Sequence, residues 1–285
     1  MFSDRLRLVG KALIALIPLA AKLLLQKIAS IYHRYTYQAV PNAKNVIVIG
    51  GSFAGFELTK RLIATVRTGY KVILIEKNSH FHHVFNFPRF SVFQGHEHTA
   101  FIPYDGIAKG APEGIFQRVQ NRVVGISDTH VVLASGEEIE YAFLAIATGS
   151  SQGLPTNVES TEREQGCAEL RSVQEAIKSA ERIAVVGAGA VGVELATDIK
   201  AFYPEKNVTL VHSRGQLLNR FGKRLHEYVL PVLQELKIKV VLNERPRLPV
   251  GKTLARDTTL RFSDEREETF DLVVRISISS IISVH

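Results

Sequence analysis

The sequence predicts an α/β fold built of two nested Rossmann-like dinucleotide-binding units, and three observations predict it. A glycine-rich turn follows an apolar run at residues 50–55, the same pattern returns at residues 187–192, and a short β-meander is expected between them. The 285 residues, 46% hydrophobic and 22% charged, suffice for two globular domains of ordinary composition. The single cysteine, Cys167, excludes an intrachain disulfide and a redox-active cysteine pair.

The excess positive charge belongs to the N-terminal segment. Residues 1–45 carry seven Lys or Arg and one Asp, whereas the other 240 residues carry 28 basic and 27 acidic ones. A nucleic-acid-binding face on the main body is therefore disfavoured. The apolar run from Ala12 to Leu25 would form about 21 Å of helix, short of the roughly 30 Å hydrocarbon core, which disfavours a membrane span.

Residues 1–40 are instead predicted as a basic amphipathic segment. Arg7, Lys11 and Lys22 fall on one arc of a helix, which suits residues 5–27 to an anionic membrane surface, although Pro18 is expected to interrupt the helix. The composition is also typical of a mitochondrial targeting segment or a secretory signal, and a helix packed on the body remains the alternative. Residues 32–41 are expected to form a linker.

The first glycine-rich turn lies between two predicted buried strands. Val46–Ile49 predicts a strand buried on both faces, Leu58–Ile63 follows with helical spacing, and Lys71–Glu76 predicts a second strand that ends in an acid. This order of elements is typical of the first half of a dinucleotide site: a strand, a glycine turn, a helix, and a second strand that ends in an acid. The alternative is a glycine turn in another kind of α/β domain.

Each residue of this turn has a physical role. Gly50 allows the tight turn, Gly55 lets the helix approach the strand, and the helix N-terminus directs free N–H groups toward a pyrophosphate. Glu76 can accept hydrogen bonds from an adenosine ribose. Ser52 occupies the place usually held by a second glycine, so its Cβ crowds the pyrophosphate unless the backbone shifts.

The second glycine-rich turn repeats the pattern. Arg182–Val186 predicts a strand that leads into Gly187, Gly189 and Gly192 in a complete G-x-G-x-x-G at the start of a helix. The next strand ends in His212 and Arg214 instead of an acid. An acid would favour the 2′-hydroxyl of NAD, whereas these two residues suit the 2′-phosphate of NADP, so both nucleotides stay open. Two such sites indicate electron transfer between bound nucleotides.

Between the two turns, three strands are expected to form the meander and a fourth to return to the first sheet: Phe116–Ile126, His130–Leu133, Glu138–Tyr141 and Phe143–Gly149. At the Ala147-Thr148-Gly149 turn the chain resembles the flavoproteins in which an NAD(P) domain interrupts an FAD domain. The local amino-acid sequence at residues 50–55, 76–77 and 87–90 is most similar to that of the apoptosis-inducing-factor-like NAD(P)H oxidoreductases (AMID or ferroptosis-suppressor type), especially fungal ones. The resemblance covers residues 44–274.

The resemblance implies an FAD-binding domain at residues 41–154 and an NAD(P)-binding domain at residues 155–275. FAD would be held by Gly50, Gly51, Ser52, Gly55, Glu76, Lys77, Arg89, Val124, Thr148 and Gly149. NAD(P)H would contact Gly187, Gly189, Gly192, His212 and Arg214. Hydride passes directly from nicotinamide to flavin and then to a quinone-like acceptor, so the protein mainly aligns two rings. The implied locations are the cytosol and mitochondrion-associated membrane surfaces.

Two of the implied site residues, Glu194 and Arg89, also have an explanation that involves no cofactor. Glu194 lies where the family places an acid near nicotinamide and flavin, which makes it the candidate catalytic residue, but an acid in a first helical turn is favoured by the helix dipole alone. Arg89 could neutralise pyrophosphate or cap the flavin pocket, or it could be an exposed loop arginine.

Two other features are assigned no chemistry. Half of the ten histidines lie at residues 80–98, but the segment lacks cysteine and the spacing of a metal site, so no metal is expected; we expect an aromatic-rich loop over the flavin. Cys167 is placed in a charged linker, where a low-pKa nucleophile is not expected.

The C-terminal part departs from the family pattern. After the expected strands Thr258–Phe262 and Phe270–Val274, relatives resume the FAD domain with a Gly-Asp turn, and this sequence has no Gly-Asp dipeptide. Residues 276–285 form an atypical β-prone tail, so the second FAD half and the C-terminal interface domain are expected to be missing. Two functions follow: a flavoprotein NAD(P)H oxidoreductase, or a truncated, catalytically impaired nucleotide-binding fragment. The oligomeric state stays open.

Overall fold

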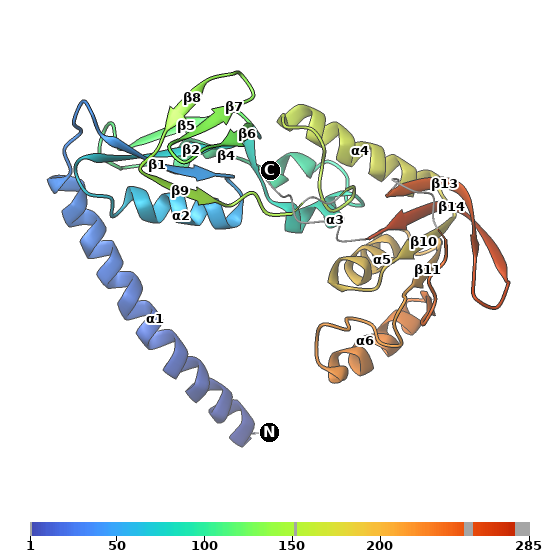
Figure 1. Cartoon of the computed structure of the whole chain (residues 1–285). Coiled ribbons are helices and arrows are strands. Elements are labelled where there is room, and N and C mark those ends of the chain that lie inside the picture. The colour runs from blue at the N-terminus through green and yellow to red at the C-terminus, as the bar shows by residue number, and fades with distance from the viewer. Residues whose placement is uncertain (1, 151–152, 248–252, 277–285) are drawn as a thin grey trace. The chain divides into compact units, whose positions relative to one another are not determined.

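A computed structural model describes residues 2–150, 153–247 and 253–276, and it confirms the predicted α/β fold with two Rossmann-like units and a meander (Figure 1). The chain forms two compact units. The first comprises the residues up to Lys77 together with Asp105–Thr148, and the second comprises Asn78–Tyr104 together with the described residues from Gly149 onward. Of the tail predicted at residues 276–285, all but Ile276 lies outside the described residues.

The first unit is built on a four-stranded parallel sheet in the order β5-β2-β1-β9. Its strands are the apolar runs that suit burial on both faces: β1 (Lys44–Ile49), β2 (Tyr70–Ile75), β5 (Phe116–Val119) and β9 (Phe143–Ile146). Helix α2 (Phe53–Ile63) lies on one face of the sheet and the meander on the other (Figure 1). The carboxyl ends of β1 and β2 therefore meet at one edge, where the first glycine turn follows β1.

The meander is shorter than the sequence predicted. It consists of three antiparallel strands: β6 (Val123–Ile126), β7 (His130–Leu133) and β8 (Glu138–Glu140). The prediction of one meander strand over Phe116–Ile126 is wrong, because β5 pairs with β2 and the chain then turns at Asn121. The N–H of Asn121 donates to the carbonyl of Glu76 at 3.2 Å, and this bond ends the parallel pairing.

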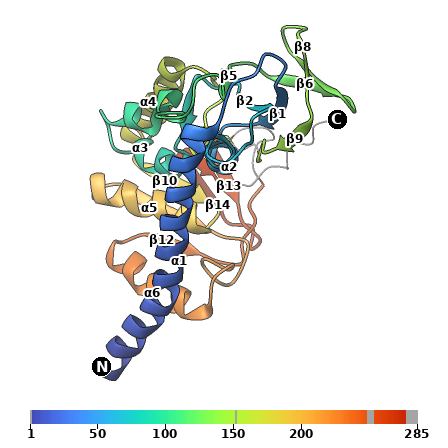
Figure 2. The ribbon, with the colours of Figure 1, turned by 90° about the vertical axis from the view of Figure 1, so that its left-hand side faces the viewer.

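Helix α1 (Phe2–Thr36) is longer than predicted and runs through Pro18 without interruption (Figures 1 and 2). The linker expected at residues 32–41 is therefore wrong in its first half. The last turn of α1 is fixed to the first unit, since the ring of His33 donates to the carbonyl of Val66 at 2.5 Å and the Tyr37 hydroxyl donates to Tyr70 at 2.9 Å. Residues Leu6–Thr36 are long and apolar enough to cross a membrane, so the length argument against a span fails.

The second unit is a five-stranded sheet in the order β12-β11-β10-β14-β13, parallel except for β13. The strands are β10 (Arg182–Val186), β11 (Asn207–Val211), β12 (Lys239–Val241), β13 (Leu254–Arg261) and β14 (Glu267–Arg275). One face packs apolar side chains against three helices, which are α4 (Arg163–Ser179), α5 (Ala190–Phe202) and α6 (Lys223–Glu235). The carboxyl ends of β10, β11, β12 and β14 thus lie along one edge.

The segment Asn78–Tyr104 packs with the second unit, although the sequence placed it within the first domain. It contains β3 (His80–His82), α3 (Phe87–Phe90), β4 (Phe101–Pro103) and the 3-10 turns Val84–Asn86 and Glu97–Ala100, and it ends where the 3-10 turn Tyr104–Gly106 begins. Its aromatic side chains form a core with Cys167 and Leu170 of α4. Cys167 is therefore buried on a helix, and its placement in a charged linker is wrong.

Candidate dinucleotide-binding sites

The first glycine loop leaves no room for side chains at two positions. Gly50 has a φ of +96°, and a Cβ there would lie 2.5 Å from the carbonyl oxygen of Ala147. A Cβ on Gly55 would lie 1.8 Å from the carbonyl oxygen of Gly50. Helix α2 therefore starts in close contact with the end of β1, which points its first N–H groups past the strand ends.

An acid stands beside this loop. Glu76, directly after β2, is 7% exposed, and its carboxylate accepts a hydrogen bond from the backbone N–H of Gly51. Ser52 is the N-cap of α2 and makes no side-chain capping bond. The loop, the acid and the helix N-terminus thus form one polar edge that fits an adenosine ribose and a pyrophosphate.

The structure brings some other predicted FAD residues to this edge. The N–H of Ala147 donates to Ile49 at 2.8 Å, and a Cβ on Gly50 would lie 3.2 Å from the Cα of Thr148. Lys77 is exposed directly after Glu76, and Val124 is exposed on β6. Gly149 has a φ of +69° and belongs to the second unit.

The second glycine loop repeats the geometry with one addition. Gly187 has a φ of +119°, and a Cβ on Gly192 would lie 1.7 Å from the carbonyl oxygen of Gly187. Gly189 is the N-cap of α5, and a Cβ there would meet no atom within 4 Å. The open space beside Gly189, at the start of a 13-residue helix, fits a pyrophosphate.

His212 lies at the end of β11 and faces this loop. It is 9% exposed, and its Nδ1 accepts a hydrogen bond from the N–H of Ala188 at 3.1 Å. Nδ1 is therefore unprotonated and Nε2 carries the proton, yet Nε2 has no partner of hydrogen-bonding geometry among the described residues. Burial lowers the pKa of His212, the charge of Arg214 lowers it further, and the nearby amide of Asn219 opposes both.

A pocket of about 850 Å³ opens at the carboxyl ends of the strands of the second unit. Its lining contains His212 and three arginines, Arg245, Arg247 and Arg275, but not Arg214. The sequence predicted His212 and Arg214 for this site but did not predict the other three arginines. Arg275 directly follows a predicted strand, so the rule that ligands bind at the carboxyl ends of parallel strands could have found it. Arg245 and Arg247 follow β12, a strand that the sequence analysis did not assign.

Arg89 and Glu194 are brought together within the second unit. The Nη2 of Arg89, on α3, lies 2.9 Å from the Oδ1 of Asp198, whose side chain is 7% exposed on α5. Glu194 lies one turn earlier on α5. Partial burial raises the pKa of the Glu194 carboxyl, the charge of Asp198 raises it further, and Arg89 opposes both. The arrangement favours a proton on Glu194 more than in water.

The histidine-rich segment is an aromatic cluster. The ring of His82 lies edge-on to Phe101 at 5.0 Å, and the ring of His96 stacks on Phe93 at 4.6 Å. In the described part of the chain, no three His, Cys, Asp or Glu side chains are grouped so as to hold a metal ion. Burial raises the pKa of the Cys167 thiol, which makes this cysteine a poor nucleophile.

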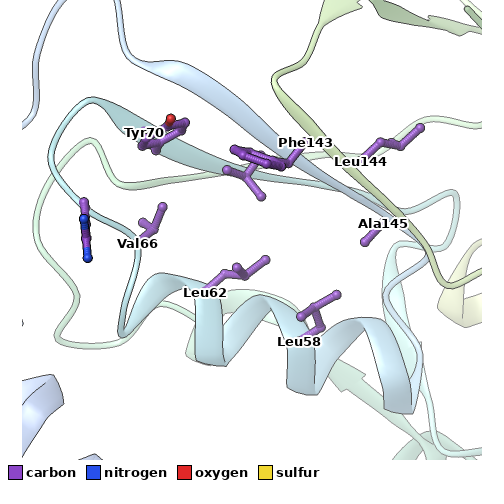
Figure 3. Close-up of a pocket in the computed structure, with 9 residues that line it drawn as sticks. Leu58, Leu62, Val66, Tyr70, Phe143, Leu144 and Ala145 are labelled. Carbon is purple, nitrogen blue, oxygen red and sulfur yellow. The ribbon is translucent and has the colours of Figure 1, made fainter. Parts of the chain in front are cut away.

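The first unit also contains an apolar pocket of about 470 Å³ between α2 and the sheet (Figure 3). Leu58 and Leu62 point into it from α2, opposite Phe143, Leu144 and Ala145 of β9 (Figure 3). Its one charged lining residue is Arg67, and the glycine loop does not line it. A phosphate would lose its hydration there without gaining hydrogen-bond donors, so the pocket does not suit a dinucleotide.

Comparisons with known proteins identify the family. Residues 44–276 match the pyridine nucleotide-disulphide oxidoreductase family. The chain is 35% identical over 253 residues to Fe-regulated protein 8 of Mycosarcoma maydis, covering 81% of this chain and 63% of that protein. It is 31% identical to ferroptosis suppressor protein 1 of Xenopus tropicalis over 258 residues, covering 86% and 67%. The chain thus spans about two thirds of the length of these relatives.

Solved structures show the same fold at low identity. A water-forming NADH oxidase from Lactobacillus brevis, bound to NADH, is 17% identical with a TM-score of 0.61, covering 83% of this chain and 54% of its own. An engineered water-forming NADPH oxidase bound to NADPH gives the same identity and TM-score, covering 81% and 53%. The fold alone therefore does not select between NADH and NADPH. The family match and the relatives confirm the resemblance seen in the sequence: the chain belongs to the pyridine nucleotide-disulphide oxidoreductase family, with FAD and NAD(P)H as its cofactors.

Proposed function

We propose that this chain is a flavoprotein oxidoreductase that takes electrons from NAD(P)H and passes them to a quinone-like acceptor. One observation carries the proposal: each unit places a tight glycine-rich turn, a helix N-terminus and a polar residue that follows the next strand at one sheet edge. The acceptor class rests on the similarity to ferroptosis suppressor protein 1.

In the first unit, Gly50, Gly51, Ser52 and Gly55 would hold the FAD pyrophosphate and Glu76 the adenosine ribose. The carboxylate of Glu76 already accepts the N–H of Gly51, which fixes the acid toward the loop. Lys77, Val124 and Thr148 would complete the adenosine and flavin contacts within this unit. When bound, FAD supplies a ring that accepts a hydride from NAD(P)H.

In the second unit, Gly187, Gly189 and Gly192 would hold the NAD(P)H pyrophosphate. The helix that begins at this turn carries Glu194 in its first turns, so the dinucleotide and the acid are positioned by one element. Asp198 fixes Arg89 beside them. Glu194, with its raised pKa, would hold or move a proton beside the bound nicotinamide.

We also propose that α1 holds the chain at a membrane surface, cytosolic or mitochondrion-associated, where a quinone-like acceptor would dissolve. Large apolar side chains of α1 are exposed over its whole described length, among them Leu13, Ile17 and Leu24 at 51%, 63% and 60%. Arg7, Lys11 and Lys22 lie on another arc and suit anionic headgroups.

The flavin spectrum of the purified full chain tests the redox proposal. We expect bound FAD, loss of its absorbance on anaerobic addition of NADPH or NADH, and recovery on addition of a water-soluble quinone. Glu76→Gln should weaken FAD binding about tenfold, because it removes a charge-assisted hydrogen bond, whereas the matched change Glu140→Gln, at an exposed acid of β8, should not. No flavin retained after added FAD would contradict the proposal and favour a nucleotide-binding fragment.

A further inference from the structure

We propose that the second unit selects a dinucleotide that carries a 2′-phosphate, and that Arg245 and Arg247, in the loop after β12, hold this phosphate. The inference rests on the proposed function of the second unit and names residues that the fingerprint of the fold does not include. In that fingerprint, the charged residue that recognises the 2′-substituent of the ribose follows the second strand, where Arg214 lies.

The loop after β12 is fixed against the end of β11. The N–H of Glu244 donates to the carbonyl of His212 at 3.0 Å, and the N–H of Asn243 donates to that of Arg214 at 3.2 Å. Arg245 and Arg247 therefore line the same pocket as His212 and Ser213. In a Rossmann fold the adenosine ribose lies at the end of this second strand, so its 2′-substituent would enter the pocket that Arg245 and Arg247 line.

The acid in the described lining of the pocket is already held by hydrogen bonds to another segment. Glu244 is the acid in its lining, and its carboxylate accepts hydrogen bonds from the N–H of Ser263 at 3.0 Å and from the Ser263 hydroxyl at 2.6 Å. With this acid engaged, the lining presents three arginines to a ligand. Arginine binds phosphate through paired N–H donors, so the chemistry favours a phosphorylated ribose over a free hydroxyl.

A second observation points to an anionic ligand in the same pocket. His212 is nine tenths buried and lines the pocket, and among the described residues its Nε2 makes no hydrogen bond of full geometry, with the side chain of Asn219 as its polar neighbour. A buried donor without an acceptor costs free energy, and a phosphate or ribose oxygen would supply the acceptor. The side chain of Arg214, by contrast, does not line the pocket among the described residues.

Calorimetric titration of the full chain with NADPH and with NADH measures the two binding affinities. This tests the inference without any flavin chemistry. We expect NADPH to bind at least about tenfold more tightly than NADH. The double variant Arg245→Ala/Arg247→Ala should lose about 10- to 100-fold in NADPH affinity and keep its NADH affinity, as expected for loss of charge-assisted bonds to one phosphate. Adenosine 2′,5′-bisphosphate and 5′-AMP, used as probes, should reproduce this difference.

Arg261→Ala is the matched control. Arg261 lies on β13 opposite Glu267, the first residue of β14, and thus at the other end of the sheet from Arg275. It should leave both affinities unchanged. Equal binding of NADPH and NADH by the wild type would overturn the inference, as would a preference that survives the double variant and disappears in Arg214→Ala. Absence of binding of either dinucleotide would instead refute the proposed function of the second unit.

Discussion

At the scale of single residues, substitutions of two glycines in the second loop should affect different properties, one the stability of the fold and the other the binding of NADPH. A Cβ on Gly192 would lie 1.7 Å from the carbonyl oxygen of Gly187, whereas a Cβ on Gly189 would have no atom of the described residues within 4 Å. Gly192→Ala should therefore destabilise the second unit by about 1–3 kcal/mol through overpacking. Gly189→Ala should change unfolding by less than about 0.5 kcal/mol, because its φ of −75° suits alanine, and should weaken NADPH binding about tenfold.

Urea unfolding and NADPH titration of both variants measure these effects. If Gly189→Ala binds NADPH as the wild type does, the space beside this glycine is not the pyrophosphate site. If Gly192→Ala unfolds at the wild-type urea concentration, the helix and strand do not need the close approach seen in the structure.

His212 gives a prediction for pH. Its pKa is lowered in the folded protein, mainly by burial, so the unfolded chain binds a proton at a higher pH than the folded one. The stability that neutral His212 contributes is fully present above its ordinary pKa of about 6.5 and is lost as the pH falls below it. His212→Gln should show a smaller loss of stability between pH 7 and pH 5 than the wild type. Urea unfolding across this range, with exposed His98→Gln as the control, measures the difference.

Local sequence pattern predicted the glycines and His212. Arg245 and Arg247 were missed because only tertiary pairing brings them to the pocket. Gly187, Gly192 and His212 each follow an apolar strand within a short stretch, so local pattern reveals them. Arg245 and Arg247 reach the pocket only because the hydrogen bond from Glu244 to His212 joins two loops 32 positions apart. Nothing in the local composition around Arg245 indicates that pairing.

At the scale of elements, the same limit explains the errors in α1 and β5. The sequence predicted a helical segment over residues 5–27 and a linker from residue 32, but the helix runs to Thr36, where His33 and Tyr37 form tertiary hydrogen bonds to the chain around Val66 and Tyr70. Pro18 is accommodated within the 35-residue helix. The strand at Phe116 was assigned to the meander because alternation does not reveal a partner, and the partner is the parallel strand β2.

The apolar stripe of α1 yields a prediction for membrane binding. Leu13, Ile17 and Leu24 fall on one arc at 100° per residue and are all exposed. Replacing the three with aspartate should abolish flotation of the full chain with anionic liposomes, because it removes apolar burial and adds repulsion. Replacing Lys11 and Lys22 with glutamine should weaken flotation mainly at low salt.

The control for this experiment is the triple change Ser30→Asp, Thr36→Asp and Gln26→Asp, which adds the same charge at polar positions of the helix. The control should retain more liposome binding than the stripe variant. Equal flotation of the wild type, the stripe variant and a chain starting at residue 41 would remove the membrane role of α1.

At the scale of the whole molecule, the two units have cores of their own. Ile47, Ile73 and Leu133 belong to a cluster of the first unit, and Val185 and Leu210 belong to a cluster of the second. A ligand that binds one folded unit stabilises that unit by about 2.7 kcal/mol at a concentration of 100 times its Kd. The two cofactors should therefore protect different sets of backbone amides.

Hydrogen exchange of the full chain checks this expectation. NADPH should slow exchange in β10, β11 and α5 by up to about 100-fold and leave β1, β2 and α2 nearly unchanged, whereas FAD should do the reverse. The Arg245→Ala/Arg247→Ala variant, exposed to the same NADPH concentration, should lose most of the protection in β10 and β11 and keep the effect of FAD. Protection of both sheets by NADPH alone would mean that the units unfold as one, and the separate binding of two dinucleotides would need another basis.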